Sequence, residues 1–254
     1  MLKNILAAAL LFTMLATTSV SQTSNSGRPL GPAGSLALTY FQNVRNGDFD
    51  AFLRGIRPRR LSPDLKAKVI AMVRKQDVIS PSAREGRVKL AALEPVLKYH
   101  ERGSVIDLVV MQADQAGLLF LAGAAVVISE KALGMLTVGE LQATVAHELG
   151  HEYFWNEYEM ARENRQYDKT KELELRCDGL AVITMSGLGL DPSHLISALN
   201  KLARSHKGDL VNGDLYPSLE ERIAFIRAMI EVVKGKRRGL SRVTSARPRK
   251  QSEA

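Results

Sequence analysis

Apolar residues in the first hundred positions recur at the three- and four-residue spacing of amphipathic helices. Ser62-Pro63 is a typical helix start, and Pro95 marks the place where the last of these helices kinks. The pattern shows no candidate chemistry, so we expect a helical lead-in region over 35–100 that packs on the remainder of the chain. The predicted helices cover residues 36–45, 48–55, 64–75 and 82–99.

The pattern changes after residue 100. Three short runs rich in Val, Ile and Leu cover 104–112, 117–121 and 124–129, and Ala122-Gly123 separates the last two. Runs of this length and composition predict β-strands. They indicate a small sheet that precedes the next helix.

Helical spacing returns at Thr137, which with Glu140 three residues later has the form of a capping box. The fold class that follows is α+β, mostly helical, with a small sheet before the helix that begins at Val138. The predicted helices in this half cover residues 138–163, 169–187, 193–204 and 218–233.

The N-terminus has the features of an export signal. Lys3 precedes an apolar run over 5–20, and small residues at 19–21 favour cleavage near Gln22. We therefore expect a signal peptide over 1–21, a linker over 22–34 and a periplasmic or secreted protein. The alternative is an uncleaved membrane anchor, although the run is shorter than the roughly 20 residues of a comfortable span. No other stretch of the sequence could span a membrane.

Composition adds two constraints. The chain has 254 residues, 45% of them hydrophobic, which suits one catalytic domain, and its single cysteine, Cys177, excludes an internal disulfide. The net charge is +8, and the segment over 235–254 carries seven Lys or Arg residues against one Glu. We expect a disordered basic tail there, either solvated without a partner or in contact with anionic surfaces. Nothing resembles a nucleic-acid-binding motif.

The candidate chemistry lies in the segment His147-Glu148-Leu149-Gly150-His151. Histidines four residues apart share one face of a helix, so both imidazoles can bind one zinc ion. Glu148 lies beside the first of them, where it can act as general base. The alternative is an ordinary amphipathic helix with two surface histidines. The remaining histidines, at 100, 194 and 206, are interpreted as surface residues.

A zinc hydrolase needs a third protein ligand. No histidine follows at the longer spacing, because position 157 is Glu157. Glu174 on the next helix is our choice, with Asp178 one turn later holding the N–H of a ligand histidine. Glu172 is the competitor. Glu157, Glu159 and Glu163 suit the role less well because they share the predicted helix of the histidines.

The run from Ala146 to His151, followed by Glu174-Leu175-Arg176-Cys177-Asp178-Gly179-Leu180-Ala181, resembles the HtpX-like and CAAX-prenyl-endopeptidase-like gluzincin zinc metallopeptidases. The likeness covers about residues 100–230, and Cys177 stands where relatives usually have Ala. It implies a zincin-like catalytic domain over 101–234 that binds one Zn²⁺ and cleaves proteins or peptides. Many relatives have several membrane spans, whereas we expect none in this chain after its N-terminus, so it is more similar to the soluble exported branch, which includes envelope quality-control proteases.

The resemblance has one departure. Relatives often carry His-Pro before the Arg-Ile pair of the last helix, whereas this chain has Tyr216-Pro217 before Arg222-Ile223. Tyr216 is a candidate donor to the developing oxyanion, with a packed loop aromatic as the alternative. We also expect the strand near 124–129 to hold substrate backbone by strand addition. Rival functions are a zinc-binding chaperone-like or assembly module and a purely structural zinc site, against which the intact Glu148 argues.

Overall fold

The computed structural model describes residues 29–76, 78–79, 84–205 and 216–245. The predicted signal peptide, most of the linker, His206 and the end of the basic tail lie outside the described residues. None of the described helices is both long and apolar enough to cross a membrane.

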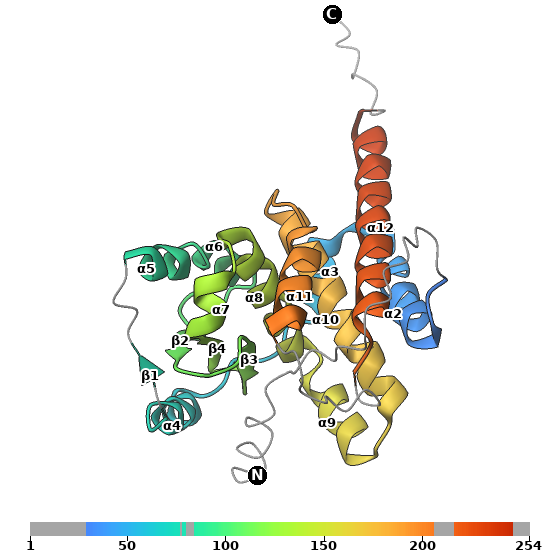
Figure 1. The fold of residues 1–254 in the computed structure, drawn as a ribbon. Helices are drawn as coiled ribbons and strands as arrows, with labels where there is room; N and C mark the ends of the chain where they lie inside the picture. Colours follow the sequence, from blue (N-terminus) through green and yellow to red (C-terminus); the bar gives the residue numbers. More distant parts are fainter. Residues whose placement is uncertain (1–28, 77, 80–83, 206–215, 246–254) are drawn as a thin grey trace, which may run out of the picture.

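The described chain is a mostly helical α+β fold with one small sheet, as the sequence predicts (Figure 1). Before the sheet core lie α2 (Pro32–Gln42), the 3-10 helix η1 (Arg45–Gly47), α3 (Phe49–Gly55), α4 (Pro63–Val73), β1 (Val78–Ile79), α5 (Arg84–Ala91) and α6 (Glu94–Tyr99). The remaining elements are β2 (Asp107–Met111), β3 (Leu118–Leu121), β4 (Ala125–Ser129), α7 (Glu130–Met135), α8 (Val138–Tyr153), α9 (Trp155–Glu163), α10 (Tyr167–Gly187), α11 (His194–Ser205) and α12 (Leu219–Ser245).

The sheet has the strand order β1-β2-β4-β3, with β2 parallel to β4 and the other pairs antiparallel. Strands β3 and β4 form a hairpin in which Leu121 pairs with Ala125, and Ala124 N donates to the Leu121 carbonyl (2.8 Å) across Ala122 and Gly123. These two residues have φ angles of 45° and 71°, positive at both central positions as a type I′ turn requires. Because β4 is hydrogen-bonded on both sides, the expectation that the strand near 124–129 receives a substrate is wrong. The edge strands of the described sheet are β1 and β3.

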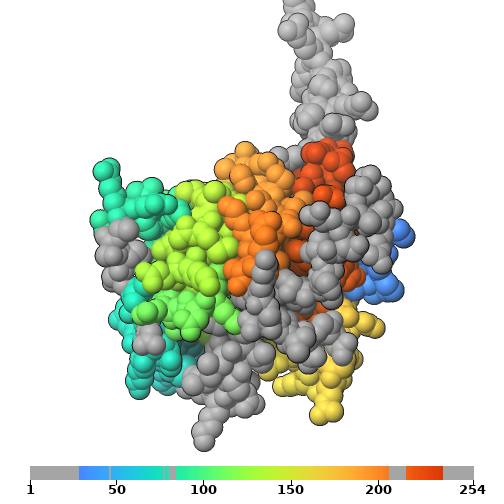
Figure 2. Space-filling view, in the orientation of Figure 1, coloured from blue at the N-terminus to red at the C-terminus, as the bar shows by residue number. Residues whose placement is uncertain are grey.

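Both faces of the sheet are covered, which explains why the strands are apolar runs without alternation. Val126 and Ile128 of β4 belong to the main core, whereas Ala125 and Val127 pack against the apolar side of α4. The lead-in helices α5 and α6 lie against α7 and α8, as the teal and green surfaces show (Figure 2).

Helix α10 is the centre of the helical part and packs against α8, α2 and α12 (Figure 1). Helix α8 starts with the predicted capping box: Thr137 Oγ1 accepts from Glu140 N (3.3 Å) and Glu140 Oε2 accepts from Thr137 N (2.8 Å). Lys201 and Ser197 of α11 also donate to Glu140. Burial opposes its charge, but these hydrogen bonds lower the pKa of Glu140 to about 2. The start of α8 is therefore fixed from two sides.

Four predicted boundaries differ from the structure. The helix expected over 138–163 breaks at Phe154, whose backbone leaves the helical region and whose ring is buried. The helix expected over 82–99 is divided, and Pro95 lies in the first turn of α6, where its missing N–H has no cost. Helix α2 begins inside the expected linker, and α12 continues to Ser245, into the segment expected to be disordered, where Lys and Arg favour helix.

The interpretation of His100 as a surface residue is wrong: its side chain is fully buried between α6, α8 and α10. Its Nδ1 hydrogen-bonds with the Tyr153 hydroxyl (2.8 Å) and its Nε2 with Thr184 Oγ1 (2.9 Å). Because the Thr184 hydroxyl donates to the Leu180 carbonyl (2.8 Å), it must accept from His100. Nε2 of the imidazole therefore carries a proton. His194 is half-buried against Gly139.

Burial, together with the positive charges of Arg57 and Arg102, lowers the pKa of His100 to about 3. An unfolded chain binds the proton near pH 6.5. The contribution of His100 to stability is therefore complete above about pH 6.5 and is lost as the pH falls toward 3.

We expect the free energy of unfolding to fall between pH 6.5 and 4 by up to about 1.4 kcal/mol per pH unit from this residue. His100→Gln keeps one donor and one acceptor for Thr184 and Tyr153 but cannot titrate, so its stability should depend less steeply on pH. Urea unfolding of both proteins across this pH range measures the two slopes. Equal slopes would contradict the assignment.

Candidate metal centre

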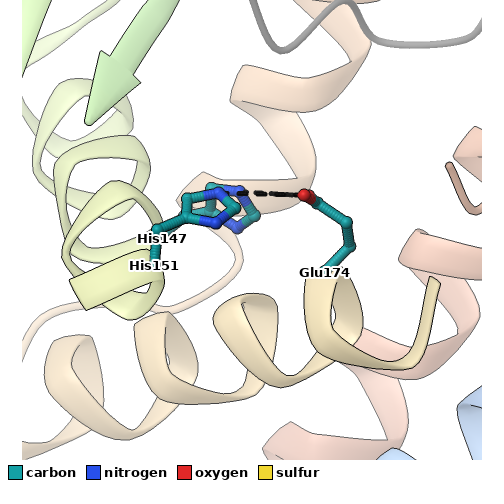
Figure 3. Close-up of side chains that lie close together, drawn as sticks. All are labelled: His147, His151 and Glu174. Carbon is teal, nitrogen blue, oxygen red and sulfur yellow. Dashed lines mark ion pairs between the residues drawn. The ribbon is translucent and has the colours of Figure 1, made fainter. Parts of the chain in front are cut away.

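The structure brings His147, His151 and Glu174 together, two from α8 and one from α10 (Figure 3). One ligand atom of each lies within 4.8 Å of the others. His147 Nε2 is 3.7 Å from Glu174 Oε2, and His151 Nε2 is 3.9 Å from Glu174 Oε1. These distances leave room for an ion between the three groups. They form a buried group that could hold a metal ion.

Two of these atoms test whether the residues fit a metal. Among the described residues, His151 Nε2 and Glu174 Oε2 are buried side-chain atoms with no hydrogen-bond partner. Unpaired polar atoms in the interior cost about 1–3 kcal/mol each, so native proteins rarely retain them without a ligand. A cation bound between them would satisfy both. Two imidazole nitrogens and one carboxylate are a ligand set typical of a zinc hydrolase.

Asp178 fixes the orientation of the first histidine. Its Oδ1 lies 2.8 Å from His147 Nδ1, which leaves Nε2 of the ring facing Glu174. Burial alone would lower the pKa of His147, but the hydrogen bond and charge of Asp178 outweigh it and raise that pKa. The sequence assigns this supporting role to Asp178, and the structure places the residue where the role requires it.

Arg222 of α12 is a residue that the sequence reasoning quoted but gave no role. It donates from Nε to Asp178 Oδ2 (2.9 Å) and from a terminal nitrogen to Oδ1 (2.6 Å). Although burial opposes the charged carboxylate, the Arg222 charge lowers the pKa of Asp178. The Arg-Ile pair of the last helix was the signal that could have identified it.

Cys177 and Gly150 form the contact between the two helices at the site. A Cβ atom on Gly150 would lie 2.8 Å from Cys177 Cα and 2.9 Å from its Cβ, so only glycine fits. The Cys177 thiol is buried, as expected, and its sulfur lies 3.7 Å from His151 Nδ1. Burial and the neighbouring carboxylates raise the pKa of this thiol well above its usual range, so it stays neutral.

Glu148 is buried next to His147 and contacts the sheet. Its Oε2 accepts a hydrogen bond from the backbone N–H of Phe120 in β3 (2.9 Å). This N–H belongs to an edge-facing position, because alternate residues of an antiparallel strand direct their amides away from the partner. The carboxylate is therefore held between the metal-binding helix and the edge of the sheet.

Two tyrosines complete the site. Tyr158 of α9 donates to Glu174 Oε1 (3.1 Å) and lies close to Tyr216. Burial and the charge of Glu174 raise the pKa of Tyr216 to about 12, so its hydroxyl keeps its proton at neutral pH. The sequence reasoning named Tyr216 but missed Tyr158, because a continuous helix over 138–163 would carry that residue away from the metal group.

The competing acidic residues lie elsewhere. Glu172 pairs with Arg176 (2.5 Å) and Lys169 (3.1 Å) on its own helix. Glu157 pairs with the same two cations (3.2 Å to each). Glu159 and Glu163 are exposed on α9. Glu157, Glu159 and Glu163 were expected to share the helix of the two histidines. That expectation is wrong, because α9 is a separate helix, but none of the three lies with His147, His151 and Glu174.

No model of a known protein family matches the chain, and no curated protein is significantly similar to it. The interpretation of His147, His151 and Glu174 as a metal centre therefore rests on the geometry of these residues.

We expect Glu174→Gln to weaken zinc binding by at least about 100-fold, because a charged ligand is replaced by a neutral amide. Glu172→Gln removes the same charge two residues away and should leave the affinity unchanged. Competition with a chromophoric chelator measures both dissociation constants. The reverse order of effects would make Glu172 the ligand.

We also expect Gly150→Ala to lower the free energy of unfolding by about 1–3 kcal/mol, because the new methyl group overlaps the α10 backbone at Cys177. Gly134→Ala is the matched control, since nothing lies within 4 Å of its Cβ position. It should be neutral or stabilise α7 by up to about 1 kcal/mol. Thermal unfolding of the two metal-free variants measures the difference.

Proposed function

We propose that the protein is a zinc-dependent endopeptidase of the HtpX-like gluzincin type, which binds one Zn²⁺ through His147, His151 and Glu174. The observation that carries the proposal is the convergence of these three buried side chains, two of which have an unpaired atom aimed at the same point. The acidic residue beside them, Glu148, supports a catalytic rather than a purely structural site. A structural zinc ion needs no general base.

In this mechanism a bound zinc ion supplies Lewis acidity, which activates water and polarises the scissile carbonyl. Glu148 accepts the proton of the attacking water and then delivers it to the leaving amine as the C–N bond breaks. The Phe120 N–H fixes one oxygen of this carboxylate, which keeps it in a single orientation beside His147. Asp178 and Arg222 keep Nε2 of His147 directed at the ligand group.

The substrate would be a protein segment in extended form. Strand β3 is one of the two edge strands of the described sheet, and the hydrogen bond from Phe120 places that edge within 2.9 Å of Glu148. A chain that pairs with this edge is held by its backbone, so side-chain selectivity would be loose. Loose selectivity suits the quality control of exported proteins, in the periplasm or outside the cell.

Tyr216 is the proposed donor to the developing oxyanion. Its hydroxyl keeps its proton at neutral pH and lies near Glu174, whose charge acts on it. The Tyr158 hydroxyl lies close to that of Tyr216, so a substrate oxygen would compete with Tyr158 for the Tyr216 proton.

The test is Glu148→Gln. We expect hydrolysis of unfolded casein to fall by about 100- to 10,000-fold, as removal of a general base does, with zinc content equal to wild type. A chelator should abolish wild-type activity, and added zinc should restore it. Equal activity of the variant would refute the mechanism. Stoichiometric zinc without turnover in wild type would favour the rival, a zinc-binding chaperone-like or assembly module.

A further inference from the structure

We propose that Tyr158 is a positioning residue of the metal centre, which holds the carboxylate of Glu174 in place and is itself held by Tyr216. This inference rests on the proposed function for its metal, but it concerns residues that the two sequence motifs do not contain. It adds a third helix, α9, to a centre otherwise built from α8 and α10.

The first support is the hydrogen bonding of Glu174. Its Oε1 accepts from the Tyr158 hydroxyl (3.1 Å), and its Oε2 has no partner among the described residues. Tyr158 is thus the hydrogen-bonding group, within the described part of the chain, that orients this carboxylate. With Oε1 occupied, Oε2 remains as the oxygen 3.7 Å from His147 Nε2.

The second support is the packing of the Tyr158 ring. It lies edge-on against the imidazole of His151, with centroids 5.6 Å apart and planes at 87°. One side chain therefore touches two of the three metal-binding residues while offering no ligand atom in the group. Residues in such outer positions typically change metal affinity by 10–100-fold when removed.

The third support is the direction of the hydrogen bonds. A carboxylate can only accept, so the single hydroxyl proton of Tyr158 goes to Glu174. A hydrogen bond between Tyr158 and the neighbouring Tyr216 can then only have Tyr216 as its donor. The chain of donors runs from Tyr216, just before α12, through Tyr158 to Glu174. Tyr216 acts on the metal centre through Tyr158.

The experiment uses the full chain and two probes, Zn²⁺ and Co²⁺. Tyr158→Phe keeps the ring against His151 and removes the hydroxyl. We expect its zinc dissociation constant to rise about 10–100-fold in chelator competition. We also expect the visible absorption bands of the cobalt form to shift, because the geometry of Glu174 changes.

Tyr153→Phe is the matched control. It removes a half-buried hydroxyl from the neighbouring helix α8, but that hydroxyl binds His100. Its zinc affinity and cobalt spectrum should equal those of wild type. Tyr216→Phe should weaken zinc binding less than Tyr158→Phe does, and the double variant should bind zinc no more weakly than Tyr158→Phe alone, because both changes act along one chain.

Wild-type affinity and an unshifted cobalt spectrum in Tyr158→Phe would overturn the inference, and so would an equal loss in Tyr153→Phe. If Tyr158→Phe does not fold, Tyr216→Phe decides: an unchanged dissociation constant there refutes the hydrogen-bond chain. A wild-type protein that binds neither metal refutes the proposed function together with this inference. Binding by wild type with no effect of either tyrosine refutes the inference alone.

Discussion

The close approach of α8 and α10 at Gly150 is the contact on which the rest of the site depends. A glycine there lets the backbone of α10 at Cys177 lie against the face of α8 between its two histidines. The helix period then places Glu174 on one side of Cys177 and Asp178 on the other, one turn apart, so that they meet different imidazole atoms of α8. Any larger residue at position 150 would separate the ligands of one helix from those of the other.

Such an approach buries charge, and a neighbouring cation neutralises most of the buried acidic residues. Asp178 is neutralised by Arg222, and Glu172 by Arg176, whose guanidinium also stacks on Tyr40 with its carbon 3.9 Å from the ring centroid. Glu174 and Glu148 differ, because their hydrogen-bond donors among the described residues are uncharged: the Tyr158 hydroxyl and the Phe120 N–H. A buried carboxylate without a cation is costly. The imbalance is located where the two unpaired atoms converge, which is the physical argument for a metal ion at that point.

Features that depend on residues close in sequence could be predicted, whereas features that depend on contacts between distant residues could not. The capping box at Thr137, the helix start at Ser62 and the helical face shared by His147 and His151 each depend on residues within one or two turns, and the structure has them. The choice of Glu174 over Glu172 was also accessible, because the helix period directs them to different sides. The burial of His100 was not, since its partners Tyr153 and Thr184 are distant in sequence. The inner position of β4 was equally hidden, because strand order depends on pairing across the sheet.

The break at Phe154 shows why the periodicity of apolar residues was insufficient. Two consecutive aromatic residues have different partners just before α9 begins at Trp155: Tyr153 bonds to His100, and the ring of Phe154 packs edge-on against Tyr40 with centroids 5.9 Å apart. A straight helix could not satisfy both and also return toward Glu174. Burying Phe154 against the lead-in helix α2 changes the chain direction, and the change brings Tyr158 to the metal centre. The helical lead-in region, which carries no chemistry of its own, thus contributes to the site by setting where the metal-binding helix ends.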